Sequence, residues 1–221
     1  ASNNTAVGYS ALNANTTGAA NVAVGTSALA ANTTASDITA VGYGSLYSNT
    51  TGANNAAFGS SALNANTTGA GNTAVGRTAL TANTTGNYST CVGYQAGAAN
   101  TSGTEHTFIG FLAGRYTTGS GIDYNTGIGS RSLYANTSGE YNVGVGAYSL
   151  AANTTASENT GIGYNAGGAI TTGANNTAVG AKALDATTTG ADNTAVGGDA
   201  LGANTTASNN TAVGYLALSA N

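Results

Sequence analysis

Residues 72–88 read NTAVGRTALTANTTGNY, and variants of this phrase follow one another along the whole chain. Each copy carries a glycine at the same place, which we call the repeat glycine. The repeat glycines are Gly8, Gly25, Gly42, Gly59, Gly76, Gly93, Gly110, Gly129, Gly146, Gly163, Gly180, Gly197 and Gly214. Successive members differ by 17 positions, except that Gly110 and Gly129 differ by 19. So short a fixed period predicts that each copy is one coil of a solenoid, which buries its apolar side only against neighbouring coils.

The expected fold class is therefore all-β: a β-solenoid, of the β-roll or β-helix type, with about 13 coils of 17 residues and one coil with a 2-residue insertion. A unit that runs from end to end leaves no place for a domain boundary, so we expect residues 1–221 to form one solenoid domain. The sequence shows no capping helix at either end. Bare strand edges invite pairing, so the chain is expected to be an excerpt of a longer fibre or the protomer of a filament.

The composition is polar but almost uncharged. Only 5% of the residues are charged, against roughly 25% in ordinary soluble proteins, and the formal net charge is −4. Four Lys and Arg residues make no basic stripe, so we expect no nucleic-acid partner. No apolar run approaches the roughly 20 residues that span a bilayer, so membrane insertion is not expected. A single cysteine excludes an intrachain disulfide.

The residue before the repeat glycine forms what we call the valine column, which is β-branched or aromatic in every copy. Its members are Val7, Val24, Val41, Phe58, Val75, Val92, Ile109, Ile128, Val145, Ile162, Val179, Val196 and Val213. Two residues earlier lies the threonine column, Thr5, Val22, Thr39, Ala56, Thr73, Thr90, Thr107, Thr126, Val143, Thr160, Thr177, Thr194 and Thr211. Residues two apart in a strand point the same way, so we predict a short Thr-x-Val strand with both columns facing the core.

The fourth residue after the repeat glycine forms the leucine column, which holds leucine in ten copies and Gly97, Gly114 and Gly167 in three. We predict that it is the second core column. Its neighbours are mostly alanines, so each coil buries little apolar area and stability has to come from stacking many coils. The Ser-Ala-Leu segment before it is compatible with an extended turn or with one helical turn, and propensity does not decide between them.

Asparagine recurs seven residues after the repeat glycine, as at Asn15, Asn32 and Asn66, in what we call the asparagine column. Aligned amides of this kind can hydrogen-bond from coil to coil. The Asn-Thr-Thr-Gly segment is predicted to be a corner, and the repeat glycine a second bend where a side chain would not fit. Asn-Thr-Thr also satisfies the N-glycosylation pattern many times, so a glycoprotein remains an alternative explanation of these residues.

The positions just after the repeat glycine vary from coil to coil and are expected to face water or a partner. They hold the five tyrosines that we single out as surface aromatics, Tyr9, Tyr43, Tyr94, Tyr164 and Tyr215. Such rings act as contact platforms for carbohydrate or are merely spaced surface residues. Both explanations stay open at this stage.

Residues 104–129 are irregular, because they contain the insertion and an unusual density of aromatic and charged side chains. The candidate contact patch consists of Phe108, Phe111, Arg115, Tyr116, Asp123 and Tyr124. Insertions in solenoids form loops, and aromatic residues beside arginine are typical contact groups. The alternative is a bulge that covers a coil whose core lost its leucines at Gly97 and Gly114.

No catalytic, cofactor-binding or metal-ligating residues are predicted, and an enzyme is not expected. Asp37, Glu105, Glu158 and Asp192 share one column, which indicates a solvated edge and not an acid–base pair. His106 is the only histidine and is expected to be a surface substitution. There is no Gly-x-Ser-x-Gly elbow, phosphate-binding loop or calcium-binding repeat.

The phrase NTAVGYxAL at residues 4–12 and 210–218 resembles repeats of bacteriophage tail-fibre proteins, and its NTAVG part resembles the head repeat of trimeric autotransporter adhesins. The resemblance extends along the whole chain. It implies a non-enzymatic structural fibre that presents an adhesive surface and is located outside the cell, on a cell surface or on a virion. The partners it implies are further copies of the chain, in a homotrimer or an end-to-end filament, and a cell-surface glycan or receptor.

An ice-binding β-solenoid is the alternative function. The threonine that follows the asparagine column recurs in every coil that reaches it, at the strand spacing of about 4.8 Å. The next residue is usually also threonine, and adjacent side chains point in different directions. This arrangement fits a flat Thr-x-Thr face poorly.

Overall fold

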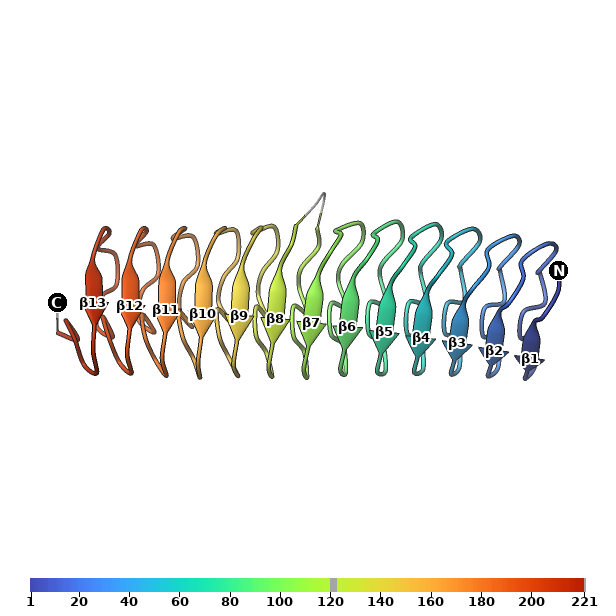
Figure 1. Cartoon of the computed structure of the whole chain (residues 1–221), viewed down its shortest axis with the longest axis horizontal. Helices are drawn as coiled ribbons and strands as arrows, with labels where there is room; N and C mark the ends of the chain where they lie inside the picture. Colours follow the sequence, from blue (N-terminus) through green and yellow to red (C-terminus); the bar gives the residue numbers. More distant parts are fainter. Residues whose placement is uncertain (120–122, 221) are drawn as a thin grey trace. The chain divides into compact units, whose positions relative to one another are not determined.

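The computed structural model describes residues 1–119 and 123–220. In this part of the chain it is all-β, with no helix, and 13 parallel strands lie in one sheet in the order of the sequence (Figure 1). The solenoid has about 12 turns of about 17 residues each, which confirms the predicted β-solenoid fold. The strands are β1 (Thr5–Val7), β2 (Val22–Val24), β3 (Thr39–Val41), β4 (Ala56–Phe58), β5 (Thr73–Val75), β6 (Thr90–Val92), β7 (Thr107–Ile109), β8 (Thr126–Ile128), β9 (Val143–Val145), β10 (Thr160–Ile162), β11 (Thr177–Val179), β12 (Thr194–Val196) and β13 (Thr211–Val213).

The chain divides into two compact units, of which the first contains β1–β6 and the second contains β7–β13. We describe each unit by itself. Residues 120–122, within the predicted insertion, and Asn221, the last member of the asparagine column, lie outside the described residues. The expectation of a single domain stays a prediction.

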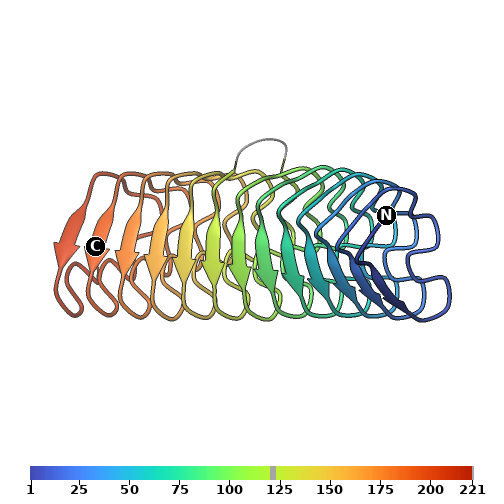
Figure 2. The same ribbon diagram turned by 45° about the vertical axis from the view of Figure 1, so that its right-hand side comes forward.

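Backbone hydrogen bonds join each coil to the next at a constant offset of one repeat. In the first unit Ala6 of β1 is opposite Ala23 of β2, and in the second unit Gly161 of β10 is opposite Ala178 of β11. Outside the strands the same register continues, since Leu29 N donates to the carbonyl of Ser45, the residue just before Leu46, at 2.9 Å. Figure 2 shows the return segments that complete each coil behind its strand. This register places like residues above one another and creates the columns predicted from the sequence.

The predicted direction of the strand side chains is wrong. The threonine and valine columns do share one side of the strand, but that side faces outward. The middle residue of each strand, the alanine column, faces the core, as shown by Ala23, Ala40 and Ala57 at 0% exposure. The opposite wall of the coil comes too close for a larger side chain here. At Gly161, in this column, an added Cβ would lie 2.6 Å from Ser149 Oγ.

The leucine column is buried as predicted in the inner coils, where Leu29, Leu46 and Leu63 are completely enclosed, whereas Leu12 in the first coil is half-buried and Leu218 in the last is 48% exposed. The turn around it is not helical. Ser27 and Leu29 both have left-handed backbone angles, with φ of 56° and 52°, while Ala28 between them does not. This alternation curls the chain tightly enough to point alanine and leucine inward together, and it excludes the helical-turn alternative.

Two coils in the second unit replace the missing leucine from another column. Phe108, in the alanine column, is completely buried and occupies the space beside Gly114, where an added Cβ would lie 2.5 Å from its ring. Gly127 in the next coil also makes room for the ring, at 3.0 Å. In a later coil Ile170, from the asparagine column, fills the space beside Gly167. The core is therefore repacked at these coils and not depleted.

Buried amides form two ladders. In the asparagine column Asn66 Nδ2 donates to Asn49 Oδ1 at 2.8 Å, and Asn83 Nδ2 donates to Asn66 Oδ1 at 2.8 Å, which confirms the predicted coil-to-coil bonding. A second ladder lies four residues before the repeat glycine, in what we call the inner asparagine column. There Asn72 Nδ2 donates to Gly86 O at 2.8 Å, and Asn72 Oδ1 accepts from Ser89 N at 2.9 Å. These bonds satisfy polar groups that the narrow core would otherwise leave unpaired.

The repeat glycine occupies a bend, as predicted. Gly25 has φ of 134°, and an added Cβ would lie 2.6 Å from Gly42 O of the next coil. Both the left-handed angle and the close backbone contact exclude a side chain, which explains why this position is glycine in every copy.

Candidate interaction surfaces

The outward side of the sheet, which we call the strand face, consists of the threonine and valine columns. It contains no Lys, Arg, Asp or Glu. Several aliphatic and aromatic side chains stand in solvent, including Phe58 in the first unit and Ile109, Ile128 and Ile162 in the second, each 38–42% exposed. A repeated row of uncharged, half-exposed apolar side chains on a polar protein makes this face a candidate interaction surface.

A second surface, which we call the flank, consists of the first, second, fifth and sixth residues after the repeat glycine. The predicted surface aromatics lie here and are exposed, which agrees with the expectation from the sequence. They are Tyr9, Tyr43, Tyr94, Tyr164 and Tyr215, with exposures of 80, 66, 39, 55 and 75%.

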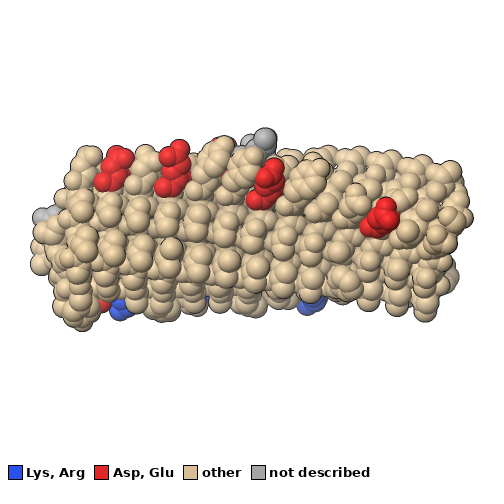
Figure 3. Space-filling model, in the orientation of Figure 1, with Lys and Arg blue, Asp and Glu red and all other residues tan. Residues whose placement is uncertain are grey.

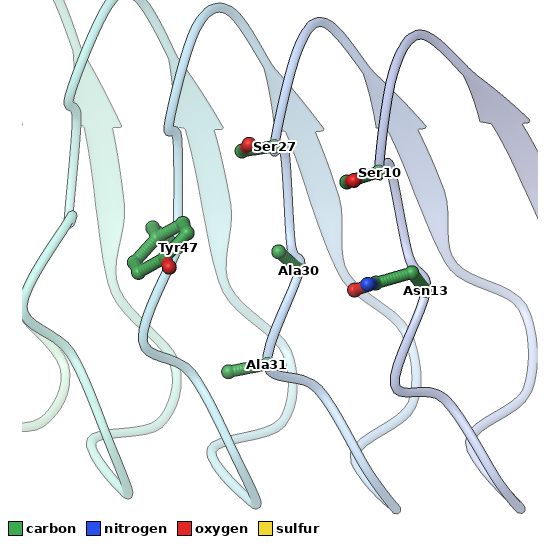
Figure 4. Close-up of a pocket in the computed structure, with 6 residues that line it drawn as sticks. All are labelled: Ser10, Asn13, Ser27, Ala30, Ala31 and Tyr47. Atoms are coloured by element: carbon green, nitrogen blue, oxygen red, sulfur yellow. The ribbon is translucent and has the colours of Figure 1, made fainter.

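In the first unit the flank contains a shallow hollow of about 220 Å³. Figure 4 shows its lining, which comes from three successive coils and consists of Ser10, Asn13, Ser27, Ala30, Ala31 and Tyr47. A second hollow beside it is lined by Ser27, Tyr43, Gly44, Tyr47 and Asn64. The linings of the two hollows consist of hydroxyl, amide, methyl and aromatic groups, without a carboxylate, histidine, lysine or arginine.

In the second unit the flank carries a connected group of arginines and tyrosines. This Arg–Tyr cluster consists of Arg115, Tyr116, Arg131, Tyr134, Tyr148 and Tyr164. The rings of Tyr116 and Tyr134 meet edge to face with centroids 5.0 Å apart, and those of Tyr148 and Tyr164 meet edge to face at 6.2 Å.

The guanidinium groups connect these rings. Arg115 Cζ lies 5.0 Å from the centre of the Tyr116 ring. Arg131 Cζ lies between two rings, 5.8 Å from the centre of Tyr134 and 5.7 Å from that of Tyr148, and Arg131 Nη1 donates to Tyr148 Oη at 3.4 Å. These are cation–π distances, so each ring helps to hold a cation in a fixed orientation at the surface.

Two phenols in the cluster are electrostatically linked. A hydrogen bond to Tyr134 raises the pKa of Tyr116, against the lowering effect of the Arg115 charge. The same hydrogen bond lowers the pKa of Tyr134; burial opposes this effect, and a hydrogen bond from Arg115 adds to it. Arg115 lowers the pKa of both phenols, because its positive charge favours the phenolate form of each.

The structure separates the candidate contact patch into different environments. Phe111, Arg115 and Tyr116 are on the flank and are at least partly exposed. Phe108 is in the core at 0% exposure, and Asp123 is only 3% exposed, so neither presents a surface. Tyr124 is exposed but stacks on Tyr141, with ring centroids 5.5 Å apart and an interplanar angle of 23°. Tyr124 and Tyr141 belong to the stretch before the inner asparagine column and not to the flank.

Sequence reasoning missed Arg131, Tyr134 and Tyr148. They lie in coils next to the candidate patch, at the second or fifth position after the repeat glycine. Aligning the coils on these positions, and not only on the position directly after the glycine, would have placed them beside Arg115.

The prediction that His106 is a surface substitution is wrong. His106 is only 1% exposed, because it occupies the inner asparagine column, whose side chains point into the coil. The four acidic residues of the edge column, Asp37, Glu105, Glu158 and Asp192, are exposed as predicted. Figure 3 shows acidic side chains as separate red spots along one face, with a few Lys and Arg atoms visible at the lower edge.

One further carboxylate on the flank is perturbed. Partial burial raises the pKa of Asp185, and the nearby Asp199 charge raises it further, while Lys182 and a hydrogen bond from Asn165 act in the opposite direction. Asp185 and Asp199 make this end of the flank acidic, in contrast to the Arg–Tyr cluster.

Within residues 1–119 and 123–220, no three or more His, Cys, Asp or Glu residues are grouped so that they could hold a metal ion. In the same part of the chain, no helix has the length and apolar character needed to cross a membrane. Cys91 is completely buried in the alanine column. Comparisons with protein-family models, with curated proteins and with solved structures gave no match.

Proposed function

We propose that this protein is a non-enzymatic structural fibre protein that assembles through its strand face and presents its flank as an adhesive surface. The single observation that carries the proposal is the uncharged row of half-exposed valine, isoleucine and phenylalanine side chains along each unit. Burying such side chains is worth about 25 cal/mol per Å² of apolar area. A face without charges can contact a second copy of itself without like-charge repulsion.

The width of the strand face favours three copies over two. Its strands are three residues long, which corresponds to about 10 Å, and the seven strands of the second unit span about 30 Å. Such a strip has roughly 300 Å² per unit, less than the roughly 800 Å² per partner of a standard stable interface. Three copies around an axis would also bury the columns beside the strip, because each copy then contacts two others. The resemblance to tail-fibre and adhesin-head repeats points to the same arrangement.

An assembly of this kind suits an exposed location on a virion, on a cell surface or in an extracellular matrix. The inter-coil bonds and the amide ladders require neither a metal nor a cofactor. A long, uniform support of this type can hold a contact surface away from its anchor.

The test is the solution mass of the chain, measured by light scattering and sedimentation together with electron microscopy. We expect particles of three times the mass of one chain, or longer assemblies of such particles. Ile162→Glu with Val196→Glu should dissociate them, because both side chains are on the strand face. Ala147→Glu with Ala181→Glu adds the same charge to the flank and should leave the assembly intact. A wild-type chain that stays monomeric at high concentration would contradict the proposal.

An ice-binding solenoid is the second candidate, and one observation favours it. On the strand face most coils pair an outward threonine with an outward Val or Ile two residues away, repeated at the strand spacing of about 4.8 Å. The adjacent threonines that argued against this function in the sequence belong to a different part of the coil. A monomer that depresses the freezing point of water below its melting point, and loses this effect in Ile162→Glu with Val196→Glu, would favour ice binding over assembly.

A further inference from the structure

We infer that the Arg–Tyr cluster is a binding site for an acidic polysaccharide, namely one whose sugars carry carboxylates. This inference rests on the proposed function, since it names the chemistry of the partner that the flank would contact. It concerns Arg115, Tyr116, Arg131, Tyr134, Tyr148 and Tyr164 of the second unit.

The distribution of charge is the first argument. The chain has four Lys and Arg residues in 221, and two of them lie in this cluster, in neighbouring coils. The Tyr134 ring lies between the two arginines. Arg131 Cζ is 5.8 Å from the ring centre, and Arg115 donates a hydrogen bond to the phenol oxygen. On a protein with net charge −4, this concentrates positive charge at one place on the flank.

The second argument is the geometry of the donors. A guanidinium carries five N–H donors in a planar fork that matches a carboxylate. Arg131 Nη1 donates a hydrogen bond to Tyr148 Oη, and Arg115 donates one to the Tyr134 phenol. Both arginines keep further N–H groups for an anion. The rings also hold the forks in place, which lowers the entropy lost when a ligand binds.

The third argument is the exposure of the rings. Tyr116, Tyr148 and Tyr164 are 42, 37 and 55% exposed although they contact one another or an arginine. Each therefore presents apolar ring surface and a phenol oxygen to solvent, which suits a ligand with both C–H faces and hydroxyl groups. The cluster runs through four successive coils, from Arg115 to Tyr164, so it fits an extended chain better than a small molecule.

An acidic peptide fits the surface less well. Peptides recognised through their backbone add to an open strand edge or lie in an apolar groove. Strands β8–β10, in the coils that carry most of the cluster, are paired on both sides, and the cluster stands on an exposed flank. Flat aromatic rings with exposed arginine forks offer alternating apolar and carboxylate contacts, which a uronic-acid polysaccharide supplies along its length.

The test measures binding of the full chain, in its assembled form, to polygalacturonate, with dextran and polyglutamate as comparison ligands. We expect binding to polygalacturonate that weakens as salt is added, with at least about tenfold weaker binding to dextran and to polyglutamate. Arg115→Gln with Arg131→Gln should weaken polygalacturonate binding by at least about tenfold. Arg77→Gln with Lys182→Gln removes the same charge elsewhere and should change it by less than about twofold.

Two further variants separate geometry from charge. Arg115→Lys with Arg131→Lys keeps the charge but loses the planar fork, so binding should still weaken clearly. Tyr148→Ala with Tyr164→Ala removes ring surface and should weaken binding, whereas Tyr43→Ala with Tyr47→Ala on the flank of the first unit should not. Thermal melting curves of every variant serve as the control that the coils remain folded.

The inference is overturned if the two charge-matched double variants lose binding equally, if polyglutamate binds as tightly as polygalacturonate, or if no polysaccharide binds. In each of these cases an intact assembly of the expected mass would leave the proposed structural function standing. Failure of assembly with retained polysaccharide binding would reject the proposed function alone.

Discussion

At the scale of single residues, the coil depends on backbone angles that ordinary side chains avoid. The leucine column and the second position after the repeat glycine have left-handed angles in coil after coil, as at Leu80 with φ of 48° and Thr78 with φ of 54°. A left-handed angle costs roughly 1–2 kcal/mol for a residue with a Cβ. Burial offsets this cost for leucine, but Thr78 is partly exposed and gains little from it.

Thr78→Gly should therefore stabilise the protein. Glycine removes the cost of the left-handed angle but loses about 0.5–1 kcal/mol of chain entropy, so we expect a net gain of about 0.5–1 kcal/mol. Thr81 is in the same coil without a left-handed angle, so Thr81→Gly should be destabilising by about 0.5–1 kcal/mol. Chemical denaturation measures the free energy of unfolding of both variants. A loss of stability in Thr78→Gly equal to that in Thr81→Gly would show that the left-handed angle is not a source of strain.

At the scale of the coil, substitutions in different columns compensate for one another. Phe108 supplies from the alanine column the volume that Gly114 fails to supply from the leucine column, and Gly127 in the next coil makes room for the ring. The sequence alone shows Phe108 as an aromatic residue beside an insertion, which led to its assignment to a contact patch. Only the packing reveals that it replaces a core leucine.

Phe108→Ala should cost about 3–5 kcal/mol, because it leaves a cavity beside Gly114. Phe108→Ala combined with Gly114→Leu restores the alanine and leucine pair of the ordinary coil and should recover most of this loss. Gly114→Leu alone should be destabilising, since its Cβ would already lie 2.5 Å from the Phe108 ring. Denaturation of the three variants gives a double-mutant cycle. Additive losses in the double variant would mean that the two side chains do not share one space.

At the scale of the whole molecule, stability is a sum over stacked coils. Each coil contacts its neighbours one repeat away, at an offset of 17 residues as in the pairs Thr39 with Ala56 and Ala56 with Thr73, or of 19 across the insertion, where Thr107 pairs with Thr126. Such a chain behaves as a nearly one-dimensional array, in which a missing copy is replaced by the next copy in register.

Deletion of residues 56–72 should therefore be tolerated, because it removes one complete copy and joins Asn55 to Thr73 in register. We expect a cooperative melt with a modest decrease in the free energy of unfolding. Deletion of residues 56–64 removes fewer residues but leaves half a coil without its strand and its leucine. It should therefore lower the free energy of unfolding far more than the first deletion. Circular dichroism during heating measures the thermal stability of both deletion variants. The opposite order of stability would reject the description of the chain as equivalent stacked coils.

The period, the presence of one strand per coil, the buried leucine column and the bend at the repeat glycine follow from the sequence by itself. A repeat of 17 residues leaves few ways to stack identical units, and a glycine that never varies indicates a backbone position without room for a Cβ. The tertiary structure alone decided which side of the strand faces the core, since the alternation in Thr-Ala-Val is the same in either direction. The wall formed by the leucine turn lies so close that only alanine-sized residues usually fit opposite it, and Phe108 fits only where glycines make room. As a result valine and threonine face outward, His106 is buried, and Arg131 meets Tyr148 of the next coil.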